Sequence, residues 1–477
     1  MSTFSGLNTA YTGLVAARQG LNVAGQNIAN ANTEGYTRQR ISTSSIGALE
    51  RTGLLTGGVQ IGQGVSVDAI ARLGDMHLDT RVRFSVGVAG YSSVRASAVS
   101  DLEASLREPG KNGISTQLQE FWASWQDLSN RPNDPAAGSV VLEEANILAG
   151  QIKSGYQEVR EQWSRVRANV DTMASQVNSA AAQVAGLNEK IRFAVANGGS
   201  ANELIDQRNL LTTELASLTG ATVRQSSDGQ VDVLIGGNAL VAGSSAHSIK
   251  VSEGSARDIS DGTGVVLEWK TRDASTPVVL GGGELAGAIS ILGSDSDKGP
   301  LKKAADEYNR FAAELTATVN SVHSTGSTST GDPAGAFFAH DVDPAGKPTN
   351  AAATLRVIPV RTAELATAAP GAGNLDGSIA DKISQLGVGP ESPDRTWEGI
   401  VTRIGVEAKT ELQQSNLANL AAQSAFTLQL SNASVDLDEE NVNLLSYQHA
   451  YQGAARVMTA IDEMLDTLIN RTGLVGR

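Results

Sequence analysis

The chain has 477 residues, enough for about two to four domains, and a formal net charge of −14. This charge argues against nucleic acid as the main partner, because phosphate contacts need clustered Lys and Arg. The absence of cysteine excludes disulfides, thiolate metal sites and cysteine nucleophiles. Aromatic residues make up only 4% of the chain, which favours long Ala-rich helices over a dense enzyme core.

Neither a membrane span nor a secretion signal is predicted. No apolar run reaches the length that a bilayer requires, so we expect no membrane partner. The amino terminus has no basic region followed by an apolar core, which a Sec signal peptide would show. If the protein leaves the cell, we expect a different export route.

Large apolar residues recur every seven positions in the first forty residues, and an alanine follows each of them by three. Such spacing predicts a helix with a heptad seam. Glycines on the same face let another helix approach closely, but each costs about 1 kcal/mol relative to alanine, so the helix needs a partner. The three sets are Leu7, Leu14, Leu21 and Ile28; Ala10, Ala17, Ala24 and Ala31; Gly6, Gly13 and Gly20.

The last forty residues carry matching heptads, which makes them the predicted partner helix. The middle of the chain must then loop out and return. From periodicity alone, an ordinary intramolecular helix pair packed on a core is an equal alternative. The two sets are Leu437, Leu444, Tyr451, Met458 and Leu465; and Tyr447, Ala454, Ile461 and Leu468.

Between these ends the chain reads as mostly helical. Residues 30–36 predict a turn, 37–66 an irregular extended segment and 62–72 a short strand or arm. One helical pattern covers 75–130 and another 136–197. The first contains an apolar cluster that we expect to be core: Phe121, Trp122, Trp125 and Leu128.

Capping signals mark two later helices. Ser200, with Glu203 three positions on, predicts a capping box for a helix that ends at Gly220. Asp394 is the predicted N-cap of a helix that runs to a Ser/Asn-rich break at 431–434. Between them, 221–283 predicts short strands and tight turns, helices resume at Glu284 and Gly299, and 355–360 predicts a strand.

These segments predict a mainly α fold with a small β insertion, in which the terminal helices pair as a coiled coil. Residues 1–74 and 432–477 would form a terminal coiled-coil and extended assembly domain. Residues 75–220 and 284–431 would form a helical-bundle middle domain, with a loop and strand region at 324–393. Residues 221–283 would form a β-rich outer domain.

The sequence offers no catalytic motif. The five histidines are scattered and show no ligand spacing. Residues 341–346 are similar to the start of a calcium loop, but they lack the third acid and contain Pro344, so a solvated turn is favoured. Paired carboxylates stay open, because their separation cannot be read from sequence. We therefore predict no enzyme activity, no cofactor and no metal.

The two ends resemble signatures of bacterial flagellar rod, hook and hook-associated proteins. The amino-terminal segments are GLVAARQGLN at 13–22 and NIANANTEGY at 27–36, and the carboxy-terminal one is SYQHAYQGAARVMTAIDEMLDTL at 446–468. Middle segments narrow the resemblance to the hook-associated protein 1 family: GQGVSV at 62–67, LQEFW at 118–122, DLSNRPNDPA at 127–136 and ELIDQRNLL at 203–211.

This resemblance implies a structural protein exported by the flagellar type III route and placed outside the cell at the hook–filament junction. The terminal helices would be disordered in the free monomer and would pair into an inner tube on assembly. The protein would form a ring with one subunit per protofilament, with hook protein below and hook-associated protein 3 above. An export chaperone would bind the carboxy-terminal helix.

The residues expected at the assembly interface come from both ends of the chain. They are Leu7, Leu14, Leu21, Ile28, Asn30, Asn32, Gly35, Tyr36, Leu444, Tyr447, Tyr451, Met458, Ile461, Leu465 and Leu468. Two alternatives remain: a hook or distal rod subunit, which shares the terminal signatures, and an extracellular adhesin or enzyme that acts through the β insertion.

Overall fold

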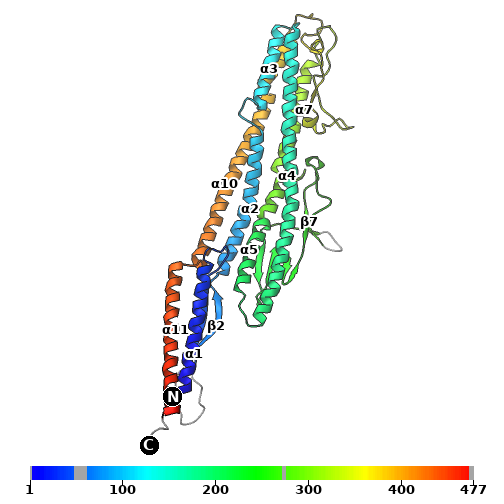
Figure 1. The fold of residues 1–477 in the computed structure, drawn as a ribbon. Helices are drawn as coiled ribbons and strands as arrows, with labels where there is room; N and C mark the ends of the chain where they lie inside the picture. The colour runs from blue at the N-terminus through cyan, green and yellow to red at the C-terminus, as the bar shows by residue number, and fades with distance from the viewer. Residues whose placement is uncertain (1–2, 48–61, 271–275, 472–477) are drawn as a thin grey trace, which may run out of the picture.

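The computed structural model describes residues 3–47, 62–270 and 276–471. It is an elongated molecule in which a helix pair from the two chain ends lies below a long helical rod (Figure 1). The pair consists of α1 (Thr3–Ala29) and α11 (Leu437–Asp466). The antiparallel strands β1 (Gln39–Ile46) and β2 (Gly64–Arg72) form an arm beside α1.

The rod is built from long helices, and α4 runs along most of its length (Figure 1). Short helices α8 (Ala351–Thr354) and α9 (Ser378–Ser384) lie in the loop-rich region after α7. The long helices are α2 (Met76–Ser105), α3 (Ile114–Asn130), α4 (Pro135–Ala196), α5 (Asn202–Thr219), α6 (Gly283–Leu292), α7 (Pro300–His323) and α10 (Pro393–Ala433).

Aspartate caps fix the start of several helices. Asp75 accepts hydrogen bonds from the backbone N–H groups at the start of α2, Asp134 does so for α4, and Asp436 for α11. Each cap satisfies donors that the helix itself leaves unpaired, and negative charge is favourable at this end of the helix dipole. The expected break between the last two helices exists but lies at 434–436 and not at 431–434, since α10 ends at Ala433 and α11 begins at Leu437.

Short antiparallel strands pack against one side of α4. Two asparagines of this helix hold them, because each exchanges hydrogen bonds with the backbone of one strand residue. Asn178 bonds both the N–H and the C=O of Ile249, and Asn188 does the same with Val231. The strands are β3 (Thr222–Gln225), β4 (Val231–Ile235), β5 (Asn238–Ala242), β6 (Ser245–Ala246), β7 (Ile249–Val251), β8 (Leu267–Trp269) and β9 (Thr276–Pro277).

One large apolar core runs through the rod. The predicted aromatic cluster belongs to it, as Phe121 and Trp125 have no exposed surface and Trp122 and Leu128 are buried. The ring of Trp125 meets Phe337 edge-on, at 5.3 Å between centroids. Phe337 lies in the loop after α7. The next two residues of this loop form β10 (Phe338–Ala339), which pairs with β11 (Arg356–Val357). The mainly α fold with a small β insertion is confirmed.

Several local predictions were wrong. The helical pattern 75–130 is two helices, because the chain turns at 106–113 between α2 and α3. Ser392, not Asp394, caps α10, and Asp394 instead accepts a hydrogen bond from the indole N–H of Trp122. The strand expected at 355–360 is reduced to two residues. The segment 37–66 includes the regular strand β1, and its residues 48–61 lie outside the described ranges.

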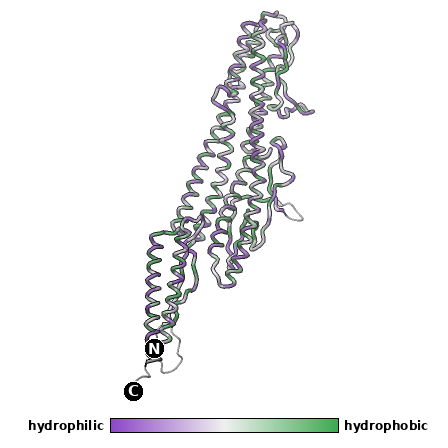
Figure 2. Tube along the Cα trace, in the orientation of Figure 1, coloured by the Kyte–Doolittle hydropathy of each residue, from purple (hydrophilic) through white to green (hydrophobic). Residues whose placement is uncertain are grey.

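Figure 2 shows purple and green alternating along the long helices. Within residues 3–47, 62–270 and 276–471, no helix combines the length and the apolar character needed to cross a bilayer.

Candidate assembly site: the terminal helix pair and its joint with the rod

A heptad of small residues on α1 faces a heptad on α11. A Cβ added to Gly6 would lie 3.3 Å from Ile461, and one added to Gly20 would lie 2.5 Å from the ring of Tyr447. Fourteen residues forward on α1 thus correspond to fourteen residues backward on α11, so the helices are antiparallel. Glycine allows this approach because no side chain separates the backbones.

The structure places the predicted interface residues in and around this seam. The large heptad of α1 is only half-buried, whereas Ala10, Ala17 and Ala24 are buried. On α11, Ile461 is buried, while Tyr451 and Leu468 are exposed. The half-buried predicted residues are Leu7, Leu14, Leu21, Ile28, Leu444, Tyr447, Met458 and Leu465.

The turn after α1 packs on the rod. Gly35 has φ +76°, and a Cβ there would lie 2.6 Å from the Leu210 side chain on α5. The Tyr36 hydroxyl donates to Asn27 Oδ1 at 2.9 Å. Burial, followed by nearby carboxylates, raises the pKa of Tyr36 to about 12, so the hydroxyl keeps its proton at neutral pH.

Of the two predicted asparagines in this turn, Asn30 makes local hydrogen bonds, and the contacts define no role for Asn32. Asn30 donates to the Gln26 carbonyl one turn back and accepts from the Thr33 hydroxyl. These bonds end the helix in the way that asparagine commonly does. Asn32 is exposed.

Asn27, which is not among the predicted interface residues, connects α1 to the arm and to α11. Its amide nitrogen donates to the Gln39 carbonyl at 2.9 Å and to Glu440 Oε2 at 3.2 Å. Its oxygen accepts from Tyr36 and from the Gln39 backbone N–H. Asn27 is fully buried, so these bonds satisfy a side chain that would otherwise destabilise the fold.

An ion-pair cluster joins the arm to the start of α11. Arg38 Nε donates to Glu440 Oε1 and its Nη1 donates to Glu439 Oε2, both at 2.8 Å. The hydrogen bond with Glu439 raises the pKa of Arg38, and the same bond lowers the pKa of the Glu439 carboxyl. Glu440 is 3% exposed, so its charge would destabilise the fold more than that of Glu439 if it lost its partner.

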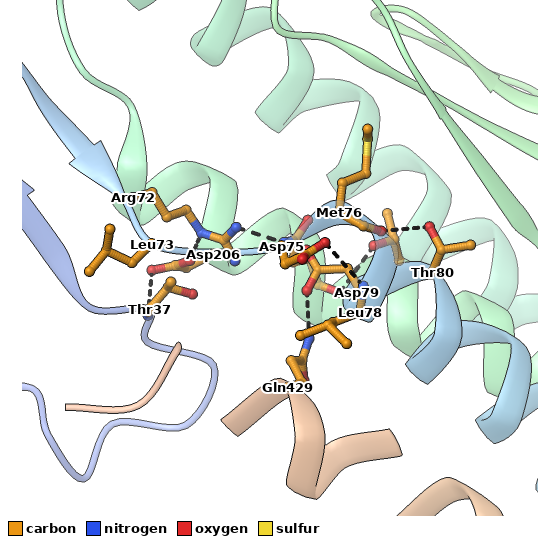
Figure 3. Close-up of polar contacts among 12 residues, drawn as sticks. Thr37, Arg72, Leu73, Asp75, Met76, Leu78, Asp79, Thr80, Asp206 and Gln429 are labelled. Carbon is orange, nitrogen blue, oxygen red and sulfur yellow. Dashed lines mark hydrogen bonds and ion pairs between the residues drawn. The ribbon is translucent and has the colours of Figure 1, made fainter. Parts of the chain in front are cut away.

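Side chains in the first turns of α5 form hydrogen bonds with the arm (Figure 3). Asp206 accepts from the Thr37 backbone N–H at 3.0 Å and from Arg72 Nε at 2.6 Å. Asn202 donates to the Ile70 carbonyl at 2.9 Å. Glu203 accepts from the Gln39 amide. The predicted capping box is therefore wrong, because Ala201 is the N-cap and the Glu203 carboxylate is turned toward the arm.

The rest of this segment ties α5 into the rod. Arg208 donates to Asn188 and to the Gly229 carbonyl, and Asn209 donates to Asp79 Oδ2 at 3.0 Å. Burial and neighbouring arginines lower the pKa of Arg208 to about 10. These residues belong to the ELIDQRNLL segment, which carries part of the family resemblance. Its dense polar pattern at 203–211 was the signal that could have located the joint.

The site is built from side chains that pair with one another across the terminal helices, the arm and α5. Among the residues that the structure describes, no group of three or more His, Asp or Glu side chains could hold a metal ion. The polar groups named above bond to one another, and Arg38, Gln39, Glu439 and Glu440 also line a small cavity between the arm and the helix pair.

Three known families match parts of the chain. "Flagellar hook-associated protein FlgK helical domain" matches residues 99–338. "Flagella basal body rod protein" matches 7–37, and "Flagellar basal body rod FlgEFG protein C-terminal" matches 429–471. The last two contain α1 with its turn and α11, so the family matches include both helices of the terminal pair.

Individual proteins that are similar to this chain point to the same family as these matches. Flagellar hook-associated protein 1 of Bacillus subtilis is 30% identical over 521 aligned positions, which cover all of both chains. The Escherichia coli protein of that name is 29% identical, over 70% of this chain and 59% of its own length. The solved flagellar hook junction protein FlgK of Burkholderia pseudomallei shares the fold, with a TM-score of 0.64 and 16% identity over 74% of this chain and all of that one.

Proposed function

This chain belongs to the flagellar hook-associated protein 1 family and is a junction component of the bacterial flagellum, and we propose that it forms a ring between hook and filament. Neighbouring subunits in this ring pack side by side through their terminal helix pairs. The observation that carries the proposal is the apolar surface that this pair leaves exposed.

Both terminal helices carry exposed apolar side chains away from their shared seam. Phe4, Tyr11 and Val15 lie on α1 opposite its buried alanines, and Phe4 is 68% exposed. On α11 the exposed set includes Val442, Leu445, Val457 and Met464. Exposed apolar surface of this extent on both sides of a narrow helix pair is a mark of protein–protein contact.

The remaining partners follow from the family resemblance. Hook protein would lie on one side of the ring and hook-associated protein 3 on the other, and an export chaperone would bind α11. The protein would reach the outside of the cell by flagellar type III export. We propose the same division of the chain as above, with a terminal assembly domain, a helical middle domain and a β-rich outer domain.

Replacing Leu445 with Asp tests the ring contact. Leu445 is 53% exposed, so the change leaves the fold intact but places a charge in the subunit interface. We expect the variant protein to be made and exported, and to be missing from isolated hooks. Val140→Asp, at a 48% exposed position on α4, is the matched control and should be incorporated normally. Normal incorporation of Leu445→Asp would contradict the proposal.

A further inference from the structure

The part of the rod next to the terminal pair contains two long helices that lie side by side, α2 and α10 (Figure 1). Arg95 of α2 donates to Glu411 of α10 at 2.9 Å, and Gln429 of α10 donates to Asp79 of α2 at 2.6 Å. Since residue numbers fall along α2 as they rise along α10, the two helices are antiparallel. Each level along α2 therefore corresponds to a level along α10.

Small residues line the contact between these two helices. Ala89 of α2 packs with Ala418 and Ala422 of α10 in a small buried cluster, and Val86 lies against it. These residues mark the inner faces of α2 and α10. The opposite sides of the two helices are their outer faces.

The outer face of α10 carries exposed leucines. Leu420 lies two positions from Ala418 and two from Ala422, which is slightly more than half a turn of a helix, so it points away from α2. Leu420 is 63% exposed, and Leu417 and Leu428 on either side of it are 68% and 40% exposed. We call these three leucines the α10 stripe.

The outer face of α2 is also apolar. Phe84 lies two positions before Val86, so it points away from α10. Phe84 is 74% exposed, and Val88, one turn further along the helix, is 42% exposed. We call these two residues the α2 patch. Exposed apolar side chains on both outer faces of the helix pair are a mark of contact with another protein.

The α10 stripe and the α2 patch lie at the same level of the rod. Phe84 is halfway between Asp79 and Ala89 in the sequence of α2. The partners of these two residues on α10 are Gln429 and the cluster alanines. The level of Phe84 therefore falls within 418–429, where most of the α10 stripe lies. Two copies placed side by side without an axial shift would bring the α10 stripe of one against the α2 patch of the other.

The distribution of charge also favours contact between copies. A net charge of −14 makes two copies repel each other, unless the surfaces that meet carry little charge. Residues 412–435 contain no Asp, Glu, Lys or Arg, whereas charged residues make up 18% of the chain. A solvent-facing helix side normally carries charged and polar residues. The outer side of α10 instead has the composition of a surface that a second copy covers.

We propose that the α10 stripe of one subunit packs on the α2 patch of the next subunit around the ring. The inference rests on the proposed ring and adds a contact on the rod to the one between terminal pairs. Two different faces on opposite sides of a subunit make a head-to-tail contact, which repeats from copy to copy and can close into a ring. The contact forms in the assembled structure, so it does not require the terminal helices to be ordered in the free chain.

Disulfide cross-linking in isolated hooks tests this contact, because the chain has no native cysteine. Phe84→Cys and Leu420→Cys are combined in one chain. Within a subunit the two positions face away from each other across the helix pair and cannot form a disulfide, which needs Cα atoms within about 7 Å. Mild oxidation should therefore link neighbouring copies, and a non-reducing gel should show a ladder of dimers and larger multimers.

Ser97→Cys combined with Leu420→Cys is the matched control. Ser97 is also exposed on α2, but it lines the cavity between α2 and α4 instead of the outer face. This pair should give no ladder, and neither should each cysteine of the 84/420 pair alone. A ladder of equal strength from the 97/420 pair would contradict the proposed contact.

Exchange of charge tests the same pairing without cysteines. Leu420→Asp should cause loss of the protein from hooks, because it places a charge against the apolar α2 patch. Adding Phe84→Lys to the same chain should restore the protein, because each lysine then meets the aspartate of the next copy. The recovery cannot arise within one chain, where the two positions lie on opposite sides of the helix pair.

A photo-cross-linking residue at Leu445, in a separate variant, reports the terminal contact of the ring. Cross-links between copies at Leu445, without a ladder from the 84/420 pair and without recovery by charge exchange, would overturn the rod contact and leave the ring standing. A ladder without a Leu445 cross-link would support the rod contact and contradict the terminal one. Absence of the native protein from hooks would overturn both.

Discussion

Gly20 lies beneath the ring of Tyr447, and this contact sets how closely α1 and α11 approach. Alanine within a helix is usually more stable than glycine by about 0.5–1 kcal/mol. At Gly20 the added methyl would meet the ring at 2.5 Å, and such overpacking costs about 1–3 kcal/mol. We therefore expect Gly20→Ala to weaken the terminal pair.

Gly13 provides the matched control, because it belongs to the same heptad and its added Cβ has no neighbour within 4 Å. In assembled hooks, where the terminal helices are expected to pair, Gly13→Ala should raise the hydrogen-exchange protection of α1, whereas Gly20→Ala should lower it. Equal gains in protection for the two variants would show that the Tyr447 contact does not limit helix approach.

His323 makes the rod sensitive to acid at a single residue. Its Nε2 accepts from the Ala366 backbone N–H at 3.1 Å, and its Nδ1 lies 2.8 Å from the Gly335 carbonyl, so the neutral tautomer with a proton on Nδ1 fits. Protonation would place a second donor against Ala366. Burial lowers the pKa of His323, and the bond to Gly335 opposes this only in part.

The lowered pKa of His323 determines how the stability of the fold changes with pH. The unfolded chain binds the proton with a pKa of about 6.5, and the folded chain binds it only at lower pH. Stability from neutral His323 is complete above about pH 6.5 and falls as the pH drops toward the folded pKa. Urea midpoints should therefore decline more between pH 7.5 and 5.5 in the native protein than in His323→Gln. Parallel declines would contradict this assignment.

Among the elements, α3 depends on its aromatic face. Trp125 has no exposed surface and contacts His323 at the end of α7 and Phe337 in the loop that follows. Trp125→Ala should lower the free energy of unfolding by about 3–5 kcal/mol, through lost burial and the cavity left behind. Phe193→Ala on α4, at a 74% exposed site, should change it little. Urea unfolding followed by circular dichroism measures both.

Elements that depend on local patterns were predictable, and those that depend on distant partners were not. Heptads located α1 and α11, and the Ser/Asn-rich break before α11 was found within a few residues. The Glu203 capping box failed because its carboxylate bonds to Gln39, which is 164 positions away. The pairing of Arg72 with Asp206 has no sequence spacing that could announce it. Thus the terminal helices were foreseen and their joint with the rod was not.

At the scale of the whole molecule, the chain combines a well-packed rod with a terminal pair that exposes apolar surface. The rod carries the apolar core, and the terminal pair attaches through polar contacts around α5. This separation is what we expect of a subunit whose ends, as proposed above, pack against neighbours while its middle folds by itself. It also explains why the terminal families and the helical-domain family match separate parts of the chain.

The outer strands should be dispensable for this role, because they pack on the side of α4 and not on the terminal pair (Figure 1). Deleting 222–281 and joining the cut ends with a short linker should leave a protein that still supports filament assembly. The ends lie close together, since a Cβ at Gly220 would be 2.7 Å from the Gly282 nitrogen. Filament counts by electron microscopy measure the outcome, and loss of filaments with the shortened protein still in the hooks would contradict it.

Electron microscopy of cells that lack this gene, with an assay of the medium for flagellin, tests the junction role most directly. We expect intact hooks without filaments, and flagellin lost to the medium because it has no site on which to assemble. Normal filaments, or cells without hooks, would contradict it.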